Sequence, residues 1–309
     1  MTNRNLRDFP KSNKYMSIKK IGILLHSNCT YPRPGAAYPP ANSYMIWALA
    51  EEWRMMGYQT EVIKGISRRC DVDVLIPHID LTVMPADYQR FLSGFQMVLN
   101  NRARDISKRL FSKNLVGPES EYEGPVIVKT DANAGGRPEL THSFLGSRSR
   151  LTGMVLRRAN ELLPRRWKRS LRAEKYPVYK NVRSVPQDIF RNKRMIVERF
   201  TPEKEGDLYV LRYYMFMGNC HTNVKMVSNQ PVFKGHGVVS RAHVPVHPDI
   251  VKLKQKMGFD YGKFDYVISQ GQVILLDTNI TPGPAPVAYR RELAQILAPG
   301  IKSYIEDIT

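Results

Sequence analysis

The stretch FDYVISQGQVILLDTNITPG, residues 264–283, decides the fold expected for this 309-residue chain. Two runs of mainly apolar residues flank Ser269-Gln270-Gly271, a pattern typical of a β-hairpin. Side chains alternate along a strand, so Asp277 and Asn279 share one side, and the hairpin brings Asp265 beside them. Taken singly, each carboxylate can be a simple strand end. Together, the three oxygen donors predict a Mg²⁺ site.

The hairpin and the following Ile280-Thr281-Pro282-Gly283 resemble the metal-binding end of the ATP-grasp superfamily. That pattern has an Asp, then an acidic residue, any residue and Asn, usually followed by Pro-Gly. The superfamily commonly has Glu where this chain has Asp277, and the shorter carboxylate still suits a metal ion. The resemblance implies ATP and Mg²⁺ as cofactors, with Mn²⁺ as an alternative ion, and Asp265, Asp277 and Asn279 as metal ligands.

A second resemblance covers the compact strand Gly124 to Lys129 and the glycines that follow it. It is similar to the superfamily's strand-borne lysine, here Lys129, and its glycine-rich phosphate loop, here Gly135 and Gly136. The lysine precedes the glycines, so this is not a Walker P-loop. Lys108 resembles the earlier nucleotide-binding lysine of the superfamily, and Lys113 is its rival.

A third resemblance is the strand MIVERF, residues 195–200, which is similar to the hinge strand that lines the adenine pocket. Strand periodicity alone predicts a half-buried edge here. The resemblance implies nucleotide contacts for Glu198, Arg199 and Phe200, with Glu203 or Glu205 at the ribose.

Basic residues beyond the hinge are candidates for catalysis. Arg212 resembles the superfamily's arginine that faces the phosphates or an acyl phosphate, and a planar guanidinium suits that role. Lys225, Lys234 and Arg241 are candidates for holding an anionic acceptor, although surface charge explains them equally well. Further acceptor candidates are loop residues: His26, Ser27, Asn28 and, as a proton acceptor, His236.

The order of the patterns predicts an α/β fold, with a parallel N-terminal lobe at residues 1–100. Residues 101–194 are expected to form a small ATP-grasp lobe with a basic helical insertion. Residues 195–309 are expected to form the C-terminal lobe with antiparallel strands and the metal site. The resemblance implies an ATP-grasp fold, with the first lobe as its pre-ATP-grasp domain and the other two as α+β nucleotide-binding lobes. Residues 88–116 have a helical pattern that is broken near Asn100 and Asn101.

The formal charge of +19 favours anionic ligands. Residues 146–194 contain 15 Lys and Arg against Glu161, Glu174 and Asp188, a local net charge of +12. This segment is interpreted as a basic lid over the acceptor or, alternatively, as a surface for nucleic acid or an anionic membrane. No apolar run reaches the roughly 20 residues of a bilayer span, and the polar start has no secretory signal, so a cytoplasmic location is expected.

The resemblance implies an ATP-dependent ligase that activates a small carboxylate as an acyl phosphate and couples it to an amine. An ATP-grasp kinase that stops after phosphorylating a small molecule is the alternative enzyme, and a basic binding protein is the alternative of another class. The sequence has no Gly-x-Ser-x-Gly or HExxH motif, and its three cysteines have no CxxC spacing, which argues against hydrolase and zinc chemistry.

Overall fold

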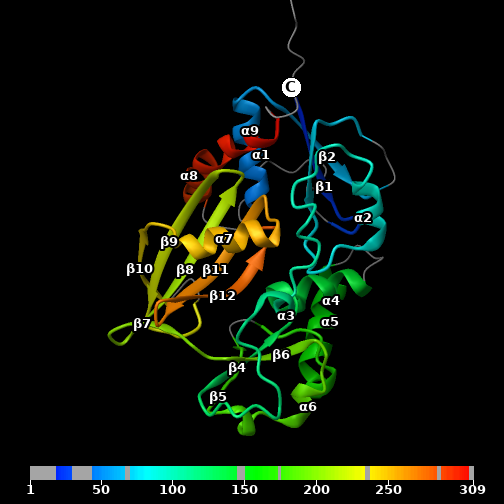
Figure 1. Ribbon diagram of the computed structural model, residues 1–309. Coiled ribbons are helices and arrows are strands. Elements are labelled where there is room, and N and C mark those ends of the chain that lie inside the picture. The colour runs from blue at the N-terminus through cyan, green and yellow to red at the C-terminus, as the bar shows by residue number, and fades with distance from the viewer. Residues whose placement is uncertain are drawn as a thin grey trace, which may run out of the picture.

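The computed structural model describes residues 19–29, 44–66, 70–144, 150–172, 175–233, 237–283 and 287–305. The described strands form three sheets (Figure 1). A parallel sheet lies in an N-terminal lobe, a large antiparallel sheet lies beside it, and a small antiparallel sheet lies below both. None of the described helices combines the length and the apolar character that crossing a bilayer requires.

The N-terminal lobe contains β1 (Lys20–Leu25), α1 (Met45–Met55), β2 (Gln59–Lys64) and β3 (Val74–His78). Its strands are parallel in the order β2-β1-β3, so the predicted βαββ opening is confirmed. Apolar residues on the two sides of β1 and β3 serve two different cores. One core contains α1 and α8 (Val287–Leu297), and the other contains α2 (Ala86–Leu92). Both faces are covered, which explains why β1 and β3 are almost entirely apolar.

The helical pattern of residues 88–116 is only partly realised. The described elements there are the end of α2 and the single turn α3 (Lys108–Phe111), with turns and isolated bridges between them. Asn100, at φ 56°, accepts hydrogen bonds from the backbone N–H groups of Asp260 and Tyr261 and donates one to the Tyr261 carbonyl. These long-range bonds hold the backbone of Asn100 in a left-handed conformation, which agrees with the expected break near Asn100 and Asn101.

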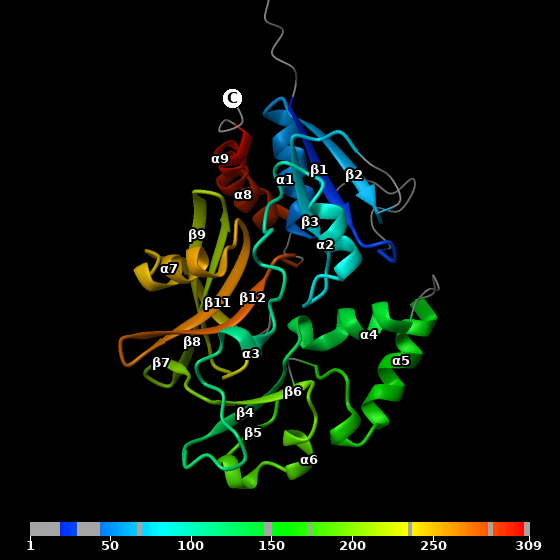
Figure 2. The same ribbon diagram turned by 45° about the vertical axis from the view of Figure 1, so that its right-hand side comes forward.

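The small sheet consists of β4 (Val126–Thr130), β5 (Val178–Tyr179) and β6 (Met195–Arg199), in the order β5-β4-β6 and antiparallel. The expected domain boundary at residue 194 therefore falls inside a sheet, because β6 pairs with β4. Helices α4 (Arg137–Phe144) and α5 (Arg150–Leu162) form an outlying pair beside this sheet (Figure 2). The segment also contains η1 (Asn133–Gly136), η2 (Arg165–Trp167), η4 (Val182–Ser184) and α6 (Gln187–Phe190).

The large sheet has the order β10-β9-β8-β11-β12, with β7 also pairing with β8. Its strands are β7 (Glu203–Glu205), β8 (Leu208–Met217), β9 (Cys220–Ser228), β10 (Val238–His243), β11 (Tyr261–Ser269) and β12 (Gln272–Asn279). Every pairing is antiparallel, as the sequence predicts. The helix α7 (Pro248–Met257) packs on one face, while α8, η5 (Ala298–Ile301) and α9 (Lys302–Ile305) join the other face to the N-terminal lobe.

Candidate nucleotide and metal site

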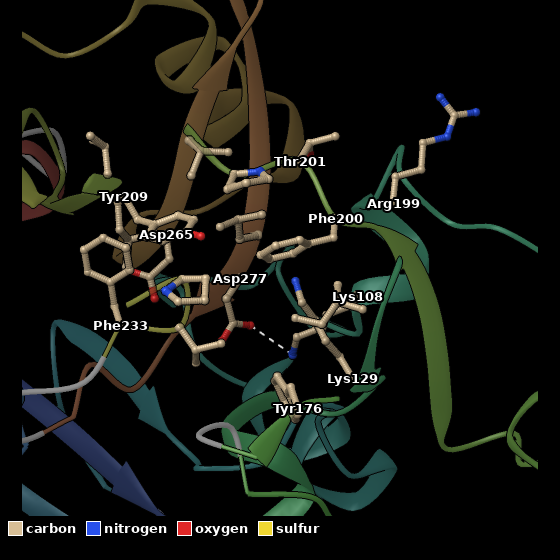
Figure 3. A pocket seen from close by; sticks show the side chains of 18 residues that line it. Lys108, Lys129, Tyr176, Arg199, Phe200, Thr201, Tyr209, Phe233, Asp265 and Asp277 are labelled. Atoms are coloured by element: carbon tan, nitrogen blue, oxygen red, sulfur yellow. Dashed lines mark ion pairs between the residues drawn. The ribbon is translucent and has the colours of Figure 1, made fainter. Parts of the chain in front are cut away.

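A cavity of about 200 Å³ lies between the small sheet and the large sheet (Figure 3). The small lobe contributes Lys108, Lys129, Tyr176 and Phe200 to its wall, and the hairpin of β11 and β12 contributes Asp265 and Asp277. Charged groups are gathered at the hairpin end. Apolar and aromatic side chains line much of the rest: Ile127, Phe200, Pro202, Tyr209, Val210, Leu211, Pro231, Val232, Phe233, Val267 and Leu276.

The predicted hairpin exists, and its strands place Asp265 directly opposite Asp277. The register then shifts, because Tyr266 pairs with Leu275 and leaves Leu276 as an extra residue in β12. Such a β-bulge changes the direction of side chains near it. As a result, β12 supplies two consecutive residues, Leu276 and Asp277, to the cavity wall.

Each of the two carboxylates is paired with a lysine. Nζ of Lys108 lies 3.1 Å from Oδ1 of Asp277, and Nζ of Lys263 lies 2.9 Å from Oδ2 of Asp265. Burial raises the pKa of Asp265, Lys263 and Lys108 oppose that rise, and Asp277 reinforces it. Burial tends to lower the pKa of Lys108, but Asp277, Tyr176 and Glu198 together outweigh this effect and raise it. The carboxylates thus form a partly buried anionic pair that cations stabilise.

Lys129 and Glu198 form a second buried ion pair, with 2.7 Å between Nζ and Oε2. They stand on adjacent strands, since Ile127 of β4 pairs with Glu198 and Lys129 pairs with Ile196. Only Lys129 of the two lines the cavity. The other oxygen of Glu198, Oε1, is buried and has no hydrogen-bond partner in the structure.

The residues expected near the base and ribose separate into two groups. Arg199 and Phe200 line the cavity, and the Arg199 guanidinium lies 5.1 Å from the ring of Tyr122. Glu203 and Glu205 bond basic residues of the large sheet instead: Glu203 bonds Arg212, and Glu205 bonds Lys225.

Asn279 is the last residue of β12, and it does not line the cavity. It pairs with Lys263 in the register, and its Oδ1 accepts a 2.7 Å hydrogen bond from the N–H of Thr281. Gly135 and Gly136 are buried against the basic segment, because the Gly135 carbonyl accepts from Leu171 N–H and a Cβ on Gly136 would stand 2.8 Å from the Arg169 carbonyl oxygen. Neither glycine is among the residues of the cavity wall.

The strand register separates the three expected catalytic residues. Paired residues on adjacent strands share a face. Arg212 pairs with Tyr266 and Lys225, and this set shares the α7 face. Arg241 belongs to the opposite face, because it pairs with Met226, which pairs with Leu211 of the cavity wall. The expected placement of Arg212 at the phosphates does not match this register, since its guanidinium bonds Glu203 on the far side at 2.5 Å and 3.2 Å.

The remaining sequence candidates that the structure describes are not part of the cavity wall. Lys113 is exposed, and His26 stacks on Tyr88, whose hydroxyl accepts from Ser27 N–H. Asn28 donates its N–H to the His26 ring. Lys234 and His236 lie outside the described residues. Among the described residues of segment 146–194, the cavity wall includes Tyr176 but none of the basic side chains.

Sequence reasoning missed Lys263, Tyr176, Tyr209 and Phe233. The signal for Lys263 was present, because a residue two positions before Asp265 on a strand shares its face. Tyr176, Tyr209 and Phe233 come from three separate segments, and only tertiary packing shows that they line one cavity.

The donor set fits Mg²⁺ held together with a nucleotide. The carboxylates of Asp265 and Asp277 supply hard oxygen ligands at the cavity wall, and Mg²⁺ characteristically completes its coordination with phosphates and water. Within the described residues there is no cluster of three or more His, Cys, Asp or Glu side chains that could hold a metal ion alone. Lys108 and Lys263 offset the carboxylate charges that a divalent cation would otherwise neutralise.

None of the known protein-family models matches the sequence, and none of the curated proteins matches it. Solved structures of similar fold include a RimK-domain ATP-grasp protein from Sphaerobacter thermophilus, at 10% identity and TM-score 0.45, covering 93% of this chain and 98% of that one. D-alanine–D-alanine ligase from Bacillus anthracis complexed with ATP has 9% identity, TM-score 0.47 and coverages of 94% and 96%. The ATP-grasp ligase PsnB complexed with minimal precursor, Mg and ADP has 11% identity, TM-score 0.45 and coverages of 94% and 97%.

Proposed function

We propose that this protein is an ATP- and Mg²⁺-dependent ligase that activates a small carboxylate and couples it to an amine. One observation carries the proposal. Asp265 and Asp277 stand opposite each other on a hairpin, and together with Lys108 and Lys129 they line a cavity between two antiparallel sheets. This arrangement combines oxygen ligands for a metal with cations for phosphates.

The cavity suggests an orientation for ATP. The aromatic and apolar wall around Phe200, Tyr209 and Phe233 takes the base, while Lys108 and Lys129 lie toward the phosphates. Asp265, Asp277 and Asn279 would hold Mg²⁺, which supplies charge neutralisation at the β- and γ-phosphate oxygens when it is bound. Lys263 places a further cation beside Asp265.

The reaction needs no covalent bond to the protein. A carboxylate oxygen of the acceptor attacks the γ-phosphorus, the bond from that phosphorus to the β,γ-bridging oxygen breaks, and ADP leaves. An amine then attacks the acyl carbon, inorganic phosphate leaves, and the nitrogen loses a proton. The lysines act by position and charge, because negative charge spreads over the transferring phosphoryl oxygens.

Calorimetric titration with a non-hydrolysable ATP analogue tests the nucleotide site. Binding should need Mg²⁺ in the wild type and should be lost in an Asp265→Ala, Asn279→Ala double variant. Asp249→Asn, an exposed change on α7, is the matched control and should bind normally. Absence of Mg²⁺-dependent binding in the wild type would overturn the proposal.

Hydroxylamine trapping tests the second part of the proposal, which is the activation of a carboxylate. With ATP, Mg²⁺ and a panel of carboxylates, an acyl phosphate reacts with hydroxylamine to give a hydroxamate and releases phosphate. Hydroxamate formation that depends on ATP supports carboxylate activation. A stable phosphorylated product that hydroxylamine does not capture would identify a kinase instead.

A further inference from the structure

A cluster of donor groups lies beside the cavity, on the side of the large sheet that faces α8. It consists of Arg241, Tyr213, Tyr289 and Lys263. Asp265 pairs with Tyr213 across β11 and β8, and Tyr213 pairs with Val224 of β9. Arg241 lies on the same face, because it pairs with Met226, and Met226 pairs with Leu211 of β8. The cluster therefore continues directly from the candidate metal carboxylate across three strands toward β10.

Arg241 is the exposed end of this cluster. No carboxylate in the described parts of the chain forms an ion pair with it, although His243 on the same strand lies 3.9 Å from Glu292. The register puts Arg241 on the same face of the sheet as Tyr213, and the guanidinium tends to lower the pKa of both tyrosines, against the larger opposing effect of burial. An arginine fork of this kind is suited to an incoming carboxylate or phosphate.

The two tyrosine hydroxyls contact each other. Burial raises the pKa of Tyr213 and of Tyr289, so both phenols carry their protons near neutral pH. A pair of phenols has two hydrogens, and only one of them can lie between the two oxygens. The second hydrogen is a donor for a ligand oxygen next to Arg241.

Lys263 joins this cluster to the reaction centre. Its Nζ bonds Asp265 and lies 5.8 Å from the centre of the Tyr213 ring. This face of the sheet thus presents the carboxylate of Asp265, the ammonium group of Lys263 and then the other three side chains of the cluster, two phenols and a guanidinium. Besides Asp265, the carboxylate that acts on this cluster is Glu292, which tends to raise the pKa of Tyr289 and lies 3.9 Å from His243. The other named groups of the cluster are donors.

We propose that Arg241, Tyr213 and Tyr289 form a subsite for a second anionic group of the acceptor. The acceptor class is a small molecule with two anionic groups: a carboxylate that is phosphorylated beside Asp265, and a second carboxylate or phosphate held by Arg241. This inference rests on the proposed function. It leaves the bond changes of the transfer as described, since the second anion is bound and does not react.

Matched ligand pairs test the subsite with the nucleotide analogue and Mg²⁺ already bound. Dicarboxylates from malonate to adipate are compared by calorimetry with monocarboxylates of the same chain length, such as glutarate with pentanoate. In the wild type, at least one dicarboxylate should bind about tenfold or more tightly than its partner, since a bond to a charged group is worth roughly 1.5–3 kcal/mol.

Arg241→Gln should abolish this preference, and Tyr289→Phe should weaken it, while the nucleotide analogue binds both variants normally. Arg183→Gln, an exposed change on η4, should keep the full preference. The subsite is refuted if no dicarboxylate is preferred by the wild type, or if Arg241→Gln keeps the preference. Failure of the analogue to bind the wild type refutes the proposed function instead, so the two failures are distinguishable.

Discussion

The hydroxyl of Thr281 donates a 2.9 Å hydrogen bond to Oδ1 of Asp80, across an interval of 201 residues. Asp80 follows β3 of the N-terminal lobe, and Thr281 follows β12. Tyr44, just before α1, donates a 2.6 Å hydrogen bond to the other oxygen of Asp80. Because Thr281 N–H also bonds Asn279, this network fixes the loop after the metal hairpin against the N-terminal lobe.

Asp80→Ala should destabilise the protein and weaken its binding of the Mg²⁺–nucleotide complex. The change removes two hydrogen bonds to a charged group, so the free energy of unfolding should fall by about 2–3 kcal/mol. Urea unfolding measures this loss. Asp71→Ala, at a fully exposed carboxylate, should change stability by less than about 0.5 kcal/mol. Equal effects of the two substitutions would show that the network does not support the loop.

Breaking the Lys129–Glu198 pair should be costly, because either single change leaves a buried charge without its partner. Lys129→Met and Glu198→Leu should each lower the free energy of unfolding by about 3–5 kcal/mol. The double variant should recover part of this loss, and a double-mutant cycle by urea unfolding measures the coupling. Additive losses would show that the two side chains act independently.

His78 should make the protein sensitive to acid. Both of its ring nitrogens are buried without a hydrogen-bond partner, and burial lowers its pKa from 6.5 to about 3. The unfolded chain takes up a proton near pH 6.5 while the folded chain does not. Stability from this group is therefore present above pH 6.5 and is lost as the pH falls toward 3, by about 1.4 kcal/mol per pH unit.

His78→Phe removes this titration while keeping a planar ring beside Tyr44 and Trp47. Urea unfolding between pH 7.5 and pH 4.5 should give a shallower pH dependence for this variant than for the wild type. His221→Gln, at an exposed histidine, should keep the wild-type slope. A wild-type slope in His78→Phe would assign the acid sensitivity to other groups.

Arg212→Met should separate stability from nucleotide binding. The change leaves Glu203 bonded only to the N–H of Ile268 on the α7 face, so unfolding should become easier by about 2–3 kcal/mol. Affinity for the nucleotide analogue should stay within about twofold, because Arg212 is on the far side of the sheet from Asp265. Calorimetry measures the affinity. A loss of tenfold or more would indicate that Arg212 acts at the nucleotide phosphates.

The hairpin was predictable because its signals are local. A turn between two apolar runs fixes the pairing, and the structure confirms that Asp265 stands opposite Asp277. The parallel opening was predictable for the same reason, since the strands β1 and β2 and the helix between them show clear periodicity.

The predictions that failed concern features that depend on contacts between distant residues. The break of the helical pattern near Asn100 was expected, but residues 93–107 form no helix, and bonds such as those of Asn100 with residues 260 and 261 fix this segment. The face of Arg212 could not be read from β8 alone, because it depends on the register with β11, and a shift of one residue would reverse it. Lys263 was missed for another reason, since strand alternation alone puts it on the face of Asp265.

Because of the bulge at Leu276, the shape of the cavity wall can be changed by deleting a residue as well as by substituting a side chain. Leu276 has no partner on β11, and both pairs that flank it, Asp265 with Asp277 and Tyr266 with Leu275, persist without it. Removing this one residue should regularise the ladder, keep the carboxylates opposite each other and take away one apolar part of the wall. A single-codon deletion thus offers a route to altered nucleotide selectivity that leaves the charged end of the site intact.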